Sequence, residues 1–311
     1  MENQRSEEIY HSLDEAVTHI FGPAARITGR VPVHGGDINR AYKLQISTGF
    51  DIFIKENSIS NIDFFLTEER GLHALRCTGQ IGVPHNMGSG IDRGRNISFL
   101  FMEYIESAPR IASYWETFGH QLAALHRAEC QSWVGAQDGG VKYGFLEDNF
   151  IGATPQKNRP CGSWIDFYRD CRLLPQITRA ERYFDSAVLK KADRLLNHLD
   201  VFLREPEFPS LLHGDLWSGN IVCGPNGRAW IIDPAACVGD FEADLAMTQL
   251  FGSLPDEFYS AYSEVNPIDK AGYSQRRGLY DLYHLLNHLN LFGSSYLGSV
   301  VNIINRYSRL I

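Results

Sequence analysis

Three oxygen-bearing side chains within residues 211–234 have the types and the spacing that phosphoryl transfer requires. Asp215 is followed five residues later by Asn220, and a second aspartate, Asp233, comes after two short apolar runs. Between these runs, residues 225–227 read Pro-Asn-Gly, which suits a tight hairpin turn. We therefore expect a loop to carry Asp215 and Asn220, and a hairpin to return Asp233 beside them.

Phosphoryl transfer depends on positioning and on neutralisation of phosphate charge, most of which magnesium supplies. Mg²⁺ prefers oxygen ligands, so Asn220 and Asp233 are the predicted metal ligands, with substrate phosphates and water in the other positions. Asp215 then remains to orient an attacking hydroxyl and to accept its proton as general base. The Asp215-to-Asn220 spacing is also that of the catalytic loop in protein kinases.

An ordinary structural explanation competes with this one. An Asp-x4-Asn pair arises about once by chance in a chain of this length. Asp and Asn also occur as turn residues that bond to their own backbone. The preceding His-Gly-Asp, the hairpin and the Ile-Ile-Asp occur together here, and this combination favours the catalytic interpretation.

Composition narrows the class of protein. The 311 residues are 44% hydrophobic and 21% charged, which is typical of a soluble globular chain of one large domain or two lobes. The net charge of −8 argues against nucleic acid as the main partner. No apolar run approaches the ~18 residues that span a bilayer, and the N-terminus lacks the apolar core of a signal peptide. With six scattered cysteines and no CxxC pair, we expect reduced thiols, a cytoplasmic location and no membrane partner.

The first part of the chain contains a candidate lysine for nucleotide phosphates. Residues 51–55 alternate like a strand and end on Lys55, which can act on phosphates as a point charge. A predicted helix at 64–75 carries Glu68, which is available to pair with Lys55 as in kinases. Taken alone, such a lysine is more often a solvated edge residue. The catalytic loop downstream is what favours the functional interpretation.

A glycine pair, Gly35 and Gly36, separates two strand-like segments at 27–33 and 38–46. Glycines between strands can let backbone amides approach phosphate oxygens. A plain hairpin has the same appearance, and there is no GxGxxG or Walker pattern to separate the two. Both interpretations stay open.

A hinge is predicted where the strand-like segment 97–102 ends. Glu103 and Tyr104 follow it, and in a kinase-like chain the backbone of the hinge bonds the adenine edge. We therefore predict a nucleotide-binding lobe at 1–104 and a catalytic and substrate-binding lobe at 105–311.

The second part of the chain reads as mostly helical. Helices are predicted at 111–127, 164–174, 187–203 and 277–292. The Gly- and Pro-rich residues 135–163 are predicted loops that wall a substrate pocket. Acidic residues in a first helical turn are stabilised by the helix dipole, which is the structural explanation for Asp240 and Glu242. Asp244 is predicted instead to brace the catalytic loop from behind. His288 lies among leucines and is more typical of a hydrogen-bonded core residue, with a place on the pocket wall beside the substrate as the alternative.

Four motifs carry a family resemblance: HGDLWSGN at 213–220, IIDPA at 231–235, EADLAMTQLFG at 242–252 and LYHLLNHLNLFG at 282–293. Together they resemble the fructosamine kinases, also called ketosamine-3-kinases, over roughly residues 10 to 300. These belong to the protein-kinase-like group that includes the aminoglycoside phosphotransferases. Aminoglycoside, choline and homoserine kinases share the His-Gly-Asp and the later Asp but generally lack the rest.

The resemblance implies an α+β, two-lobed protein-kinase-like fold, with a small β-rich N-lobe around one main helix and a larger, mostly helical C-lobe. It implies ATP- and Mg²⁺-dependent phosphorylation of the sugar 3-hydroxyl of a ketosamine, free or on a glycated protein. The unstable 3-phosphate then eliminates and releases the free amine, so the biological result is deglycation.

Residue roles follow from the same resemblance. The phosphate-anchoring pair is Lys55 with Glu68, the base is Asp215, and the magnesium ligands are Asn220 with Asp233. Trp217 either stacks on the sugar or is a core tryptophan beneath the loop. Some relatives carry a cysteine where this chain has Asp37, so a disulfide switch in that loop is not expected here. Asp-Pro in place of Asp-Phe-Gly argues against an activation-loop switch.

Two other functions are considered. One is a kinase for another small hydroxyl compound, such as an aminoglycoside or another amino sugar. The other is a catalytically dead binding module, which the retention of all five catalytic and anchoring residues argues against. The preferred ketosamine sugar and the oligomeric state stay open.

Overall fold

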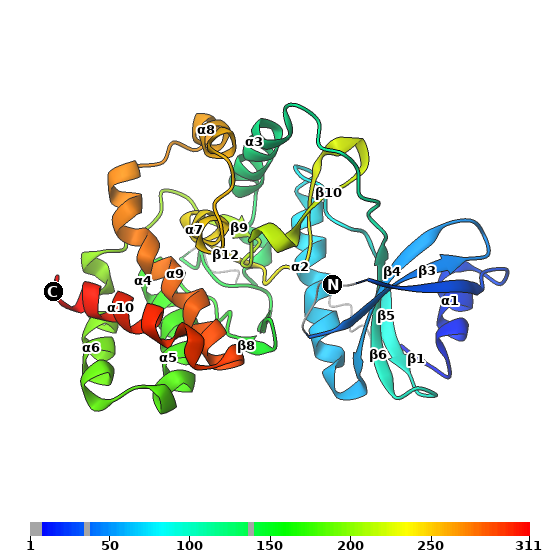
Figure 1. Ribbon diagram of the computed structural model, residues 1–311, viewed down its shortest axis with the longest axis horizontal. Coiled ribbons are helices and arrows are strands. Elements are labelled where there is room, and N and C mark those ends of the chain that lie inside the picture. Colours follow the sequence, from blue (N-terminus) through cyan, green and yellow to red (C-terminus); the bar gives the residue numbers. More distant parts are fainter. Residues whose placement is uncertain (1–7, 34–37, 136–139) are drawn as a thin grey trace.

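The computed structural model describes residues 8–33, 38–135 and 140–311. An N-terminal β-rich lobe is followed by a mostly helical C-terminal lobe (Figure 1), so the predicted two-lobed α+β fold is confirmed. The predicted phosphate loop at Gly35 and Gly36, and Asp37 beside it, lie outside the described residues.

The N-lobe is a six-stranded sheet in the order β1-β5-β6-β4-β3-β2, with only the β1–β5 pair parallel. Its strands are β1 (Ile9–Tyr10), β2 (Ile27–Val33), β3 (Arg40–Ile46), β4 (Asp51–Ser58), β5 (Asn86–Asp92) and β6 (Ile97–Glu103). Two helices accompany it, α1 (Leu13–Phe21) and α2 (Ile62–Cys77), and the short turn η1 (Ile59–Asn61) leads into α2.

The alternation of side chains along the central strands assigns each helix a face of the sheet. Along β6, Phe99 and Phe101 pack into the core on the α1 side, whereas Leu100 and Met102 pack into the core that includes α2. Lys55 of β4 pairs in register with Leu100. Residues paired in register on neighbouring strands have their side chains on the same face of the sheet. Leu100 faces the core that includes α2, so Lys55 also points toward α2, the helix that carries Glu68.

The C-lobe contains α3 (Tyr114–Arg127), α4 (Trp164–Tyr168), α5 (Leu174–Ala180), α6 (Ser186–Leu196), α7 (Glu242–Leu250), α8 (Asp256–Val265), α9 (Lys270–Phe292) and α10 (Leu297–Ser308). Short 3₁₀ turns are η2 (Gln131–Trp133), η4 (Glu181–Tyr183), η5 (Leu199–Val201), η6 (Ser218–Asn220), η7 (Pro225–Gly227) and η8 (Ser294–Tyr296). A π-helical turn, Arg169–Leu173, joins α4 to α5, so the helix predicted at 164–174 continues to Ala180. None of the helices in the described parts of the chain is long and apolar enough to cross a membrane.

Three short strand pairs lie in the C-lobe. They are β7 (Asn149–Ile151) with β8 (Thr154–Gln156), β9 (Ser210–Leu212) with β12 (Cys237–Gly239), and β10 (Ile221–Cys223) with β11 (Ala229–Ile231). The β10–β11 pair is the hairpin expected before Asp233. The β7–β8 pair lies within 135–163, which was predicted to be loop, because three-residue strands are too short to show a periodic pattern.

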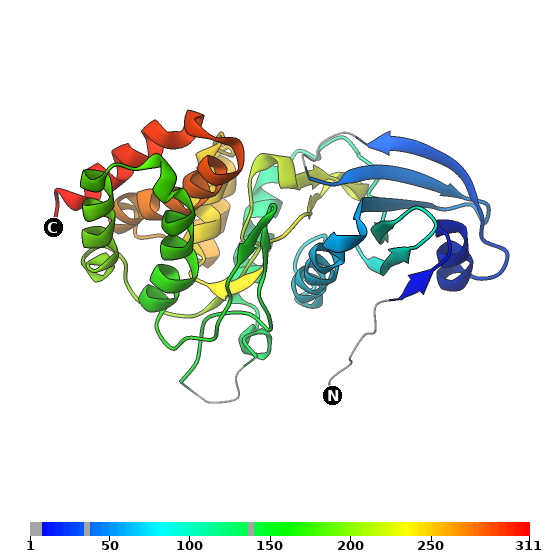
Figure 2. The same cartoon turned by 90° about the horizontal axis from the view of Figure 1, so that it is seen from below.

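Helix α2 lies between the sheet and the C-lobe and connects them (Figure 1). Arg70 of α2 forms an ion pair with Glu147, and the Phe64 ring meets the Phe150 ring edge-on at 4.3 Å. Seen from below, the β7–β8 pair, drawn in green, lies on the side of the C-lobe that faces α2 (Figure 2). Helix α2, which carries Glu68, therefore packs against the N-lobe sheet on one side and against the C-lobe on the other.

Candidate active site

The loop after β9 carries Asp215 and Asn220, and the β10–β11 hairpin returns Asp233 to this loop. The Asn220 carboxamide Nδ2 donates to the backbone oxygen of Asp215 at 2.8 Å and to its Oδ2 at 3.2 Å. The backbone oxygen of Asn220 accepts from the Ile232 N–H at 3.1 Å. The residue before Asp233 is therefore bonded directly to the loop, as the hairpin prediction requires.

His213 forms hydrogen bonds to the backbone of Asp215 and of Ile232, the residue before Asp233. Its Nε2–H donates to the Ile232 carbonyl at 2.8 Å, and its Nδ1 accepts from the Asp215 N–H at 3.2 Å. Burial lowers the pKa of His213, so the ring stays neutral and keeps one nitrogen as donor and the other as acceptor. One imidazole thus fixes the backbone on either side of the site.

Close backbone approach explains the glycine of His-Gly-Asp. Gly214 has φ 79°, and a Cβ placed there would lie 2.1 Å from the Ala235 carbonyl oxygen. Asp233 also lies in the left-handed region, with φ 57°. A non-glycine residue there carries strain, which is commonly found at functional sites.

Lys55 lies between two carboxylates. Its Nζ is 2.5 Å from Glu68 Oε1 and 2.7 Å from Asp233 Oδ1. Burial disfavours the ammonium, but the charges of Asp233 and Glu68 outweigh it and raise the pKa of Lys55 above its ordinary value. The lysine is therefore charged, and it links the N-lobe sheet to the predicted metal ligand.

Asp215 is suited to accept a proton near neutral pH. Burial and then the charge of Asp233 raise the pKa of Asp215 to about 7, while the hydrogen bond from Asn220 acts in the opposite direction. A general base is most effective when its pKa lies close to the working pH.

The residues present suit a magnesium ion held together with nucleotide phosphates. The Asp233 side chain is 42% exposed and uses one oxygen for Lys55. Asn220 bonds Asp215 through Nδ2, which leaves its carbonyl oxygen for a cation. Mg²⁺ is usually coordinated by one or two protein oxygens, and phosphate oxygens and water molecules fill its other positions. Across residues 8–33, 38–135 and 140–311, no group of three or more His, Cys, Asp or Glu forms an alternative metal cage.

Asp244 braces the catalytic loop from behind, the role predicted for it. Its carboxylate accepts from the N–H groups of His213 and Gly214, at 2.7 and 2.8 Å, and from His126 Nε2 at 3.2 Å. Burial alone would raise the pKa of Asp244, but the hydrogen bond and charge of His126 hold it below the ordinary value. The ionised carboxylate thus fixes the backbone just before Asp215.

We expect Asp244→Ala to lower the free energy of unfolding by about 3–5 kcal/mol, because it leaves buried donors without their charged partner. Urea denaturation measures this change. Asp244→Asn keeps one acceptor oxygen and should lose less. A loss within about 1 kcal/mol for the alanine variant would contradict the bracing role.

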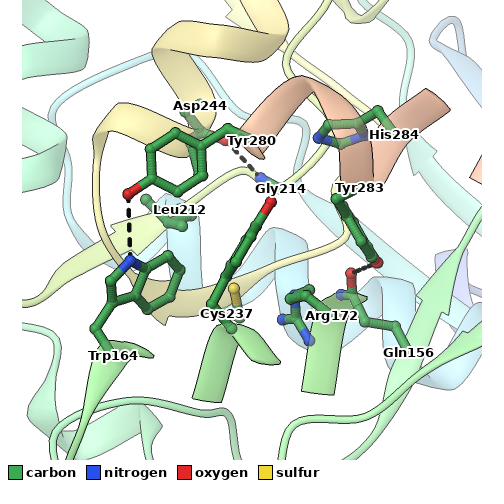
Figure 3. Close-up of a pocket in the computed structure, with 12 residues that line it drawn as sticks. Gln156, Trp164, Arg172, Leu212, Gly214, Cys237, Asp244, Tyr280, Tyr283 and His284 are labelled. Atoms are coloured by element: carbon green, nitrogen blue, oxygen red, sulfur yellow. Dashed lines mark hydrogen bonds between the residues drawn. The ribbon is translucent and has the colours of Figure 1, made fainter. Parts of the chain in front are cut away.

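Buried amides hold the chain after Asp233. Gln156 Nε2 donates to the Ala235 carbonyl at 3.1 Å, and Asn149 Nδ2 donates to the Ala236 carbonyl at 2.9 Å. The Tyr283 hydroxyl donates to Gln156 Oε1, and Figure 3 shows this bond beside the bond from Gly214 to Asp244. These residues were not predicted from the sequence, because single amides in a Gly- and Pro-rich segment look like turn residues.

The space in Figure 3 lies behind the catalytic loop. Its volume is about 20 Å³, which admits about one water molecule and no sugar. It is lined by Gly214, Asp244, Arg172, Tyr283 and His284, among others. Burial, followed by the nearby His288, lowers the pKa of His284 to about 3, so this ring is neutral. The residues that line this space therefore support the loop and do not form a substrate pocket.

The predicted hinge residues have partners of their own. The Glu103 N–H donates to the His85 carbonyl at 2.9 Å, so this N–H is not available to an adenine edge. The Glu103 carboxylate accepts from the His85 N–H at 3.1 Å. Lys43 Nζ lies 4.5 Å from the centre of the Tyr104 ring. β6 ends at Glu103, next to the boundary predicted between residues 104 and 105, which stays a prediction.

Trp217 is an exposed residue, so the alternative of a core tryptophan is wrong. Its ring lies against Gly219, where an added Cβ would come within 2.3 Å of it. His288 is half-buried and is hydrogen-bonded, since its Nδ1–H donates to the His284 carbonyl at 2.8 Å. Both belong to an aromatic cluster that includes Phe251.

Comparison with known proteins supports one family. A model described as Fructosamine kinase matches residues 9–309. A probable ketoamine kinase from Synechocystis sp. is 37% identical over 306 residues, covering 97% of each chain. A chloroplastic protein-ribulosamine 3-kinase from Oryza sativa subsp. japonica is 40% identical over 296 residues, covering 93% of this chain and 82% of that protein.

Solved structures agree. A chain from Thermobifida fusca described as a fructosamine-3-kinase superposes with a TM-score of 0.80 at 31% identity, covering 97% of this chain and 100% of the other. An aminoglycoside 2'-phosphotransferase superposes with a TM-score of 0.55 at 14% identity, covering 95% and 97%, which shows a shared fold. With its catalytic loop, hairpin aspartate and lysine–glutamate pair assembled in this fold, the chain belongs to the fructosamine kinase family.

Proposed function

We propose that the protein transfers the γ-phosphoryl group of ATP to the 3-hydroxyl of a ketosamine, with Mg²⁺, and that the substrate is free or attached to a glycated protein. Phosphorylation of a ketosamine hydroxyl follows from membership of the family. The 3-position is the one in the names of the ribulosamine 3-kinases from plants. The observation that carries the proposal is the contact of Lys55 with Asp233 beside Asp215 and Asn220.

Each residue has a distinct task in this proposal. The oxygen of the sugar hydroxyl bonds to the γ-phosphorus, and Asp215 accepts the hydroxyl proton. The bond between the γ-phosphorus and the bridging oxygen of the β-phosphate breaks at the same time, and ADP leaves. Lys55, held by Glu68, lies beside the phosphates as a fixed positive charge. Asn220 and Asp233 would hold Mg²⁺, which when bound neutralises phosphate charge. His213 and Asp244 keep the loop in place and touch no substrate.

Trp217 is proposed to stack on the sugar, and His288 to lie on the pocket wall beside it. Trp217 lies two residues after the base, and its ring is exposed at 37%. A rigid aromatic face next to the base can orient a polyhydroxylated carbon chain through its C–H groups.

Trp217→Ala is expected to raise KM for the ketosamine about tenfold while KM for ATP stays unchanged, because a lost stacking contact is worth about 1.4 kcal/mol. Steady-state kinetics with each substrate varied in turn measures both constants. Trp217→Phe keeps an aromatic face and should stay within about threefold of the wild type. An unchanged ketosamine KM in the alanine variant would remove Trp217 from the sugar site.

The direct test of the function is phosphorus NMR of the products from a panel of ketosamines, aminoglycosides and amino sugars. A ketosamine 3-phosphate should form and then decay with release of the free amine, whereas the other phosphates should persist. A stable phosphorylated aminoglycoside as the main product would overturn the proposal.

A cytoplasmic location is also proposed. All six cysteines are free, as expected in a reducing compartment. The net charge of −8 supports a substrate other than nucleic acid.

A further inference from the structure

Exposed aromatic rings gather at one place in the protein. Across the described residues, four Phe or Trp side chains are exposed: Phe50, Trp217, Phe251 and Phe292, at 38%, 37%, 38% and 51%. Phe50 lies in the N-lobe against Phe21. The other three belong to one cluster that begins next to the catalytic loop. Exposed apolar groups that gather in this way commonly mark binding sites.

We call this cluster the aromatic track; its members are Trp217, Phe251, His288, Phe292 and Tyr296. The Phe251 ring lies 6.4 Å from Trp217 and 4.7 Å from His288. The His288 ring lies 5.4 Å from Phe292 and 5.1 Å from Tyr296. The track therefore runs continuously from beside Asp215 to the end of α9.

Phe251 and Phe292 are each placed by a glycine that ends a helix. α7 is followed by Phe251 and then Gly252 (φ 119°), and α9 ends at Phe292 before Gly293 (φ 89°). A glycine with positive φ ends a helix, so the α-helix does not continue past the ring before it. Because α7 packs against α9 (Figure 1), both ends present their rings to the same cluster. The repeated Leu-Phe-Gly at 250–252 and 291–293 is the sequence signal for a helix end with an exposed phenylalanine.

His288 supplies a hydrogen-bond acceptor at the centre of the track. Its Nδ1–H donates to the His284 carbonyl, so Nε2 of the neutral ring carries the lone pair. In the described parts of the chain, no hydrogen bond to this Nε2 is formed. Burial lowers the pKa of His288, so the ring is neutral at physiological pH and does not repel a cation.

A ketosamine has two chemically distinct halves. One is the sugar, which carries the hydroxyl that is phosphorylated, and the other is the amine with its carbon substituent. This secondary amine is a cation at neutral pH. Aromatic faces attract such cations, and apolar rings also cover the attached carbon chain. With the sugar at Trp217, the amine half extends along the track.

We propose that Phe251 and Phe292, with His288 between them, form a subsite for the amine half of the ketosamine. Phe251 contacts the ammonium, His288 Nε2 accepts its N–H, and Phe292 covers the carbon chain where it leaves the protein. This inference rests on the proposed ketosamine kinase function and adds recognition of the amine to it. The exposed outer end, at Phe292, suits an amine that is a lysine side chain of another protein.

The test compares Phe251→Ala and Phe292→Ala with Phe50→Ala, a control with the same exposed fraction as Phe251 but in the N-lobe. Two ketosamines of the sugar that the wild type prefers are used, one made from Nα-acetyl-lysine and one from methylamine. For the lysine compound, both test variants should raise KM about fivefold, with kcat and KM for ATP unchanged. For the methylamine compound, Phe251→Ala should still raise KM, whereas Phe292→Ala should not. Phe50→Ala should change neither.

Equal KM values for the lysine compound in all three variants would overturn the subsite, as would a loss of kcat with both compounds and unchanged KM. A wild type that phosphorylates neither ketosamine would instead refute the proposed function itself. The two failures are therefore distinguishable in one set of assays.

Discussion

Asp233→Ala is expected to reduce turnover by about 10³-fold or more. The side chain pairs with Lys55 Nζ at 2.7 Å and leaves its other oxygen for Mg²⁺, so its removal affects both the anchoring lysine and the metal. Charge stabilisation by a metal is worth several kcal/mol in the transition state, and each 1.4 kcal/mol corresponds to about a factor of ten in rate.

Two measurements separate this effect from simple misfolding. Initial rates at saturating ATP and ketosamine give the loss of turnover, with Asp200→Ala, an exposed aspartate in η5, as the control. Thermal shift with ATP, with and without Mg²⁺, gives the metal dependence of nucleotide binding. The wild type should gain more stability when Mg²⁺ is present, and the Asp233 variant should gain equally in both conditions. Near-normal turnover by Asp233→Ala would remove this residue from the metal site.

Asp215→Asn is expected to lose about 10²–10⁴-fold in turnover, the usual contribution of a general base. The amide keeps the shape of the side chain but cannot accept the hydroxyl proton. Initial-rate kinetics at saturating substrate measures the loss. Turnover close to that of the wild type would show that another group accepts the proton.

The same variant should be more stable than the wild type at neutral pH when metal is absent. The pKa of Asp215 is raised from 3.8 to about 7, because of burial and the neighbouring Asp233. A raised carboxyl pKa means that Asp215 contributes stability below the unfolded pKa and loses it as the pH rises through about 7. Asparagine has no charge to lose. In EDTA, the Tm difference should therefore grow between about pH 4 and pH 7 and favour the variant.

A Tm difference that does not change over this pH range would show that Asp215 is already ionised in the folded protein. Asp200→Asn serves as the matched control, because its carboxylate is exposed. The comparison isolates the effect of the Asp215 charge from the general effect of acid on the chain.

The residues of the proposed phosphate site could be predicted because local patterns place them. The alternation of β4 and the helical spacing of α2 bring Lys55 to Glu68, and the hairpin β10–β11 returns Asp233 to the loop. These patterns involve residues that are close in the sequence. The period of a strand or a helix then fixes the face on which each side chain lies. The hydrogen bond of Asn220 to Asp215 follows from their spacing in one short loop.

The supports of the site could not be predicted in this way. Asp244 bonds the loop from 30 residues downstream of Gly214, and Gln156 reaches Ala235 across 79 residues. No periodic pattern links such distant segments, because their contact depends on how α7 and the β7–β8 pair pack. Asp244 was predicted to brace the loop because it lies in the first turn of a predicted helix just after the hairpin, whereas Gln156 has no sequence signal.

The amino-acid sequence by itself determined the family, the two-lobed fold and the group of charged residues proposed to bind the phosphates, because motif residues and short-range periodicity specify them. Only the tertiary structure decided that Trp217 is exposed, and that Phe251, His288 and Phe292 continue from it in one track. These rings come from three separate segments: the catalytic loop, the end of α7 and the last turns of α9. Contacts of this kind depend on packing between elements, which no local pattern records.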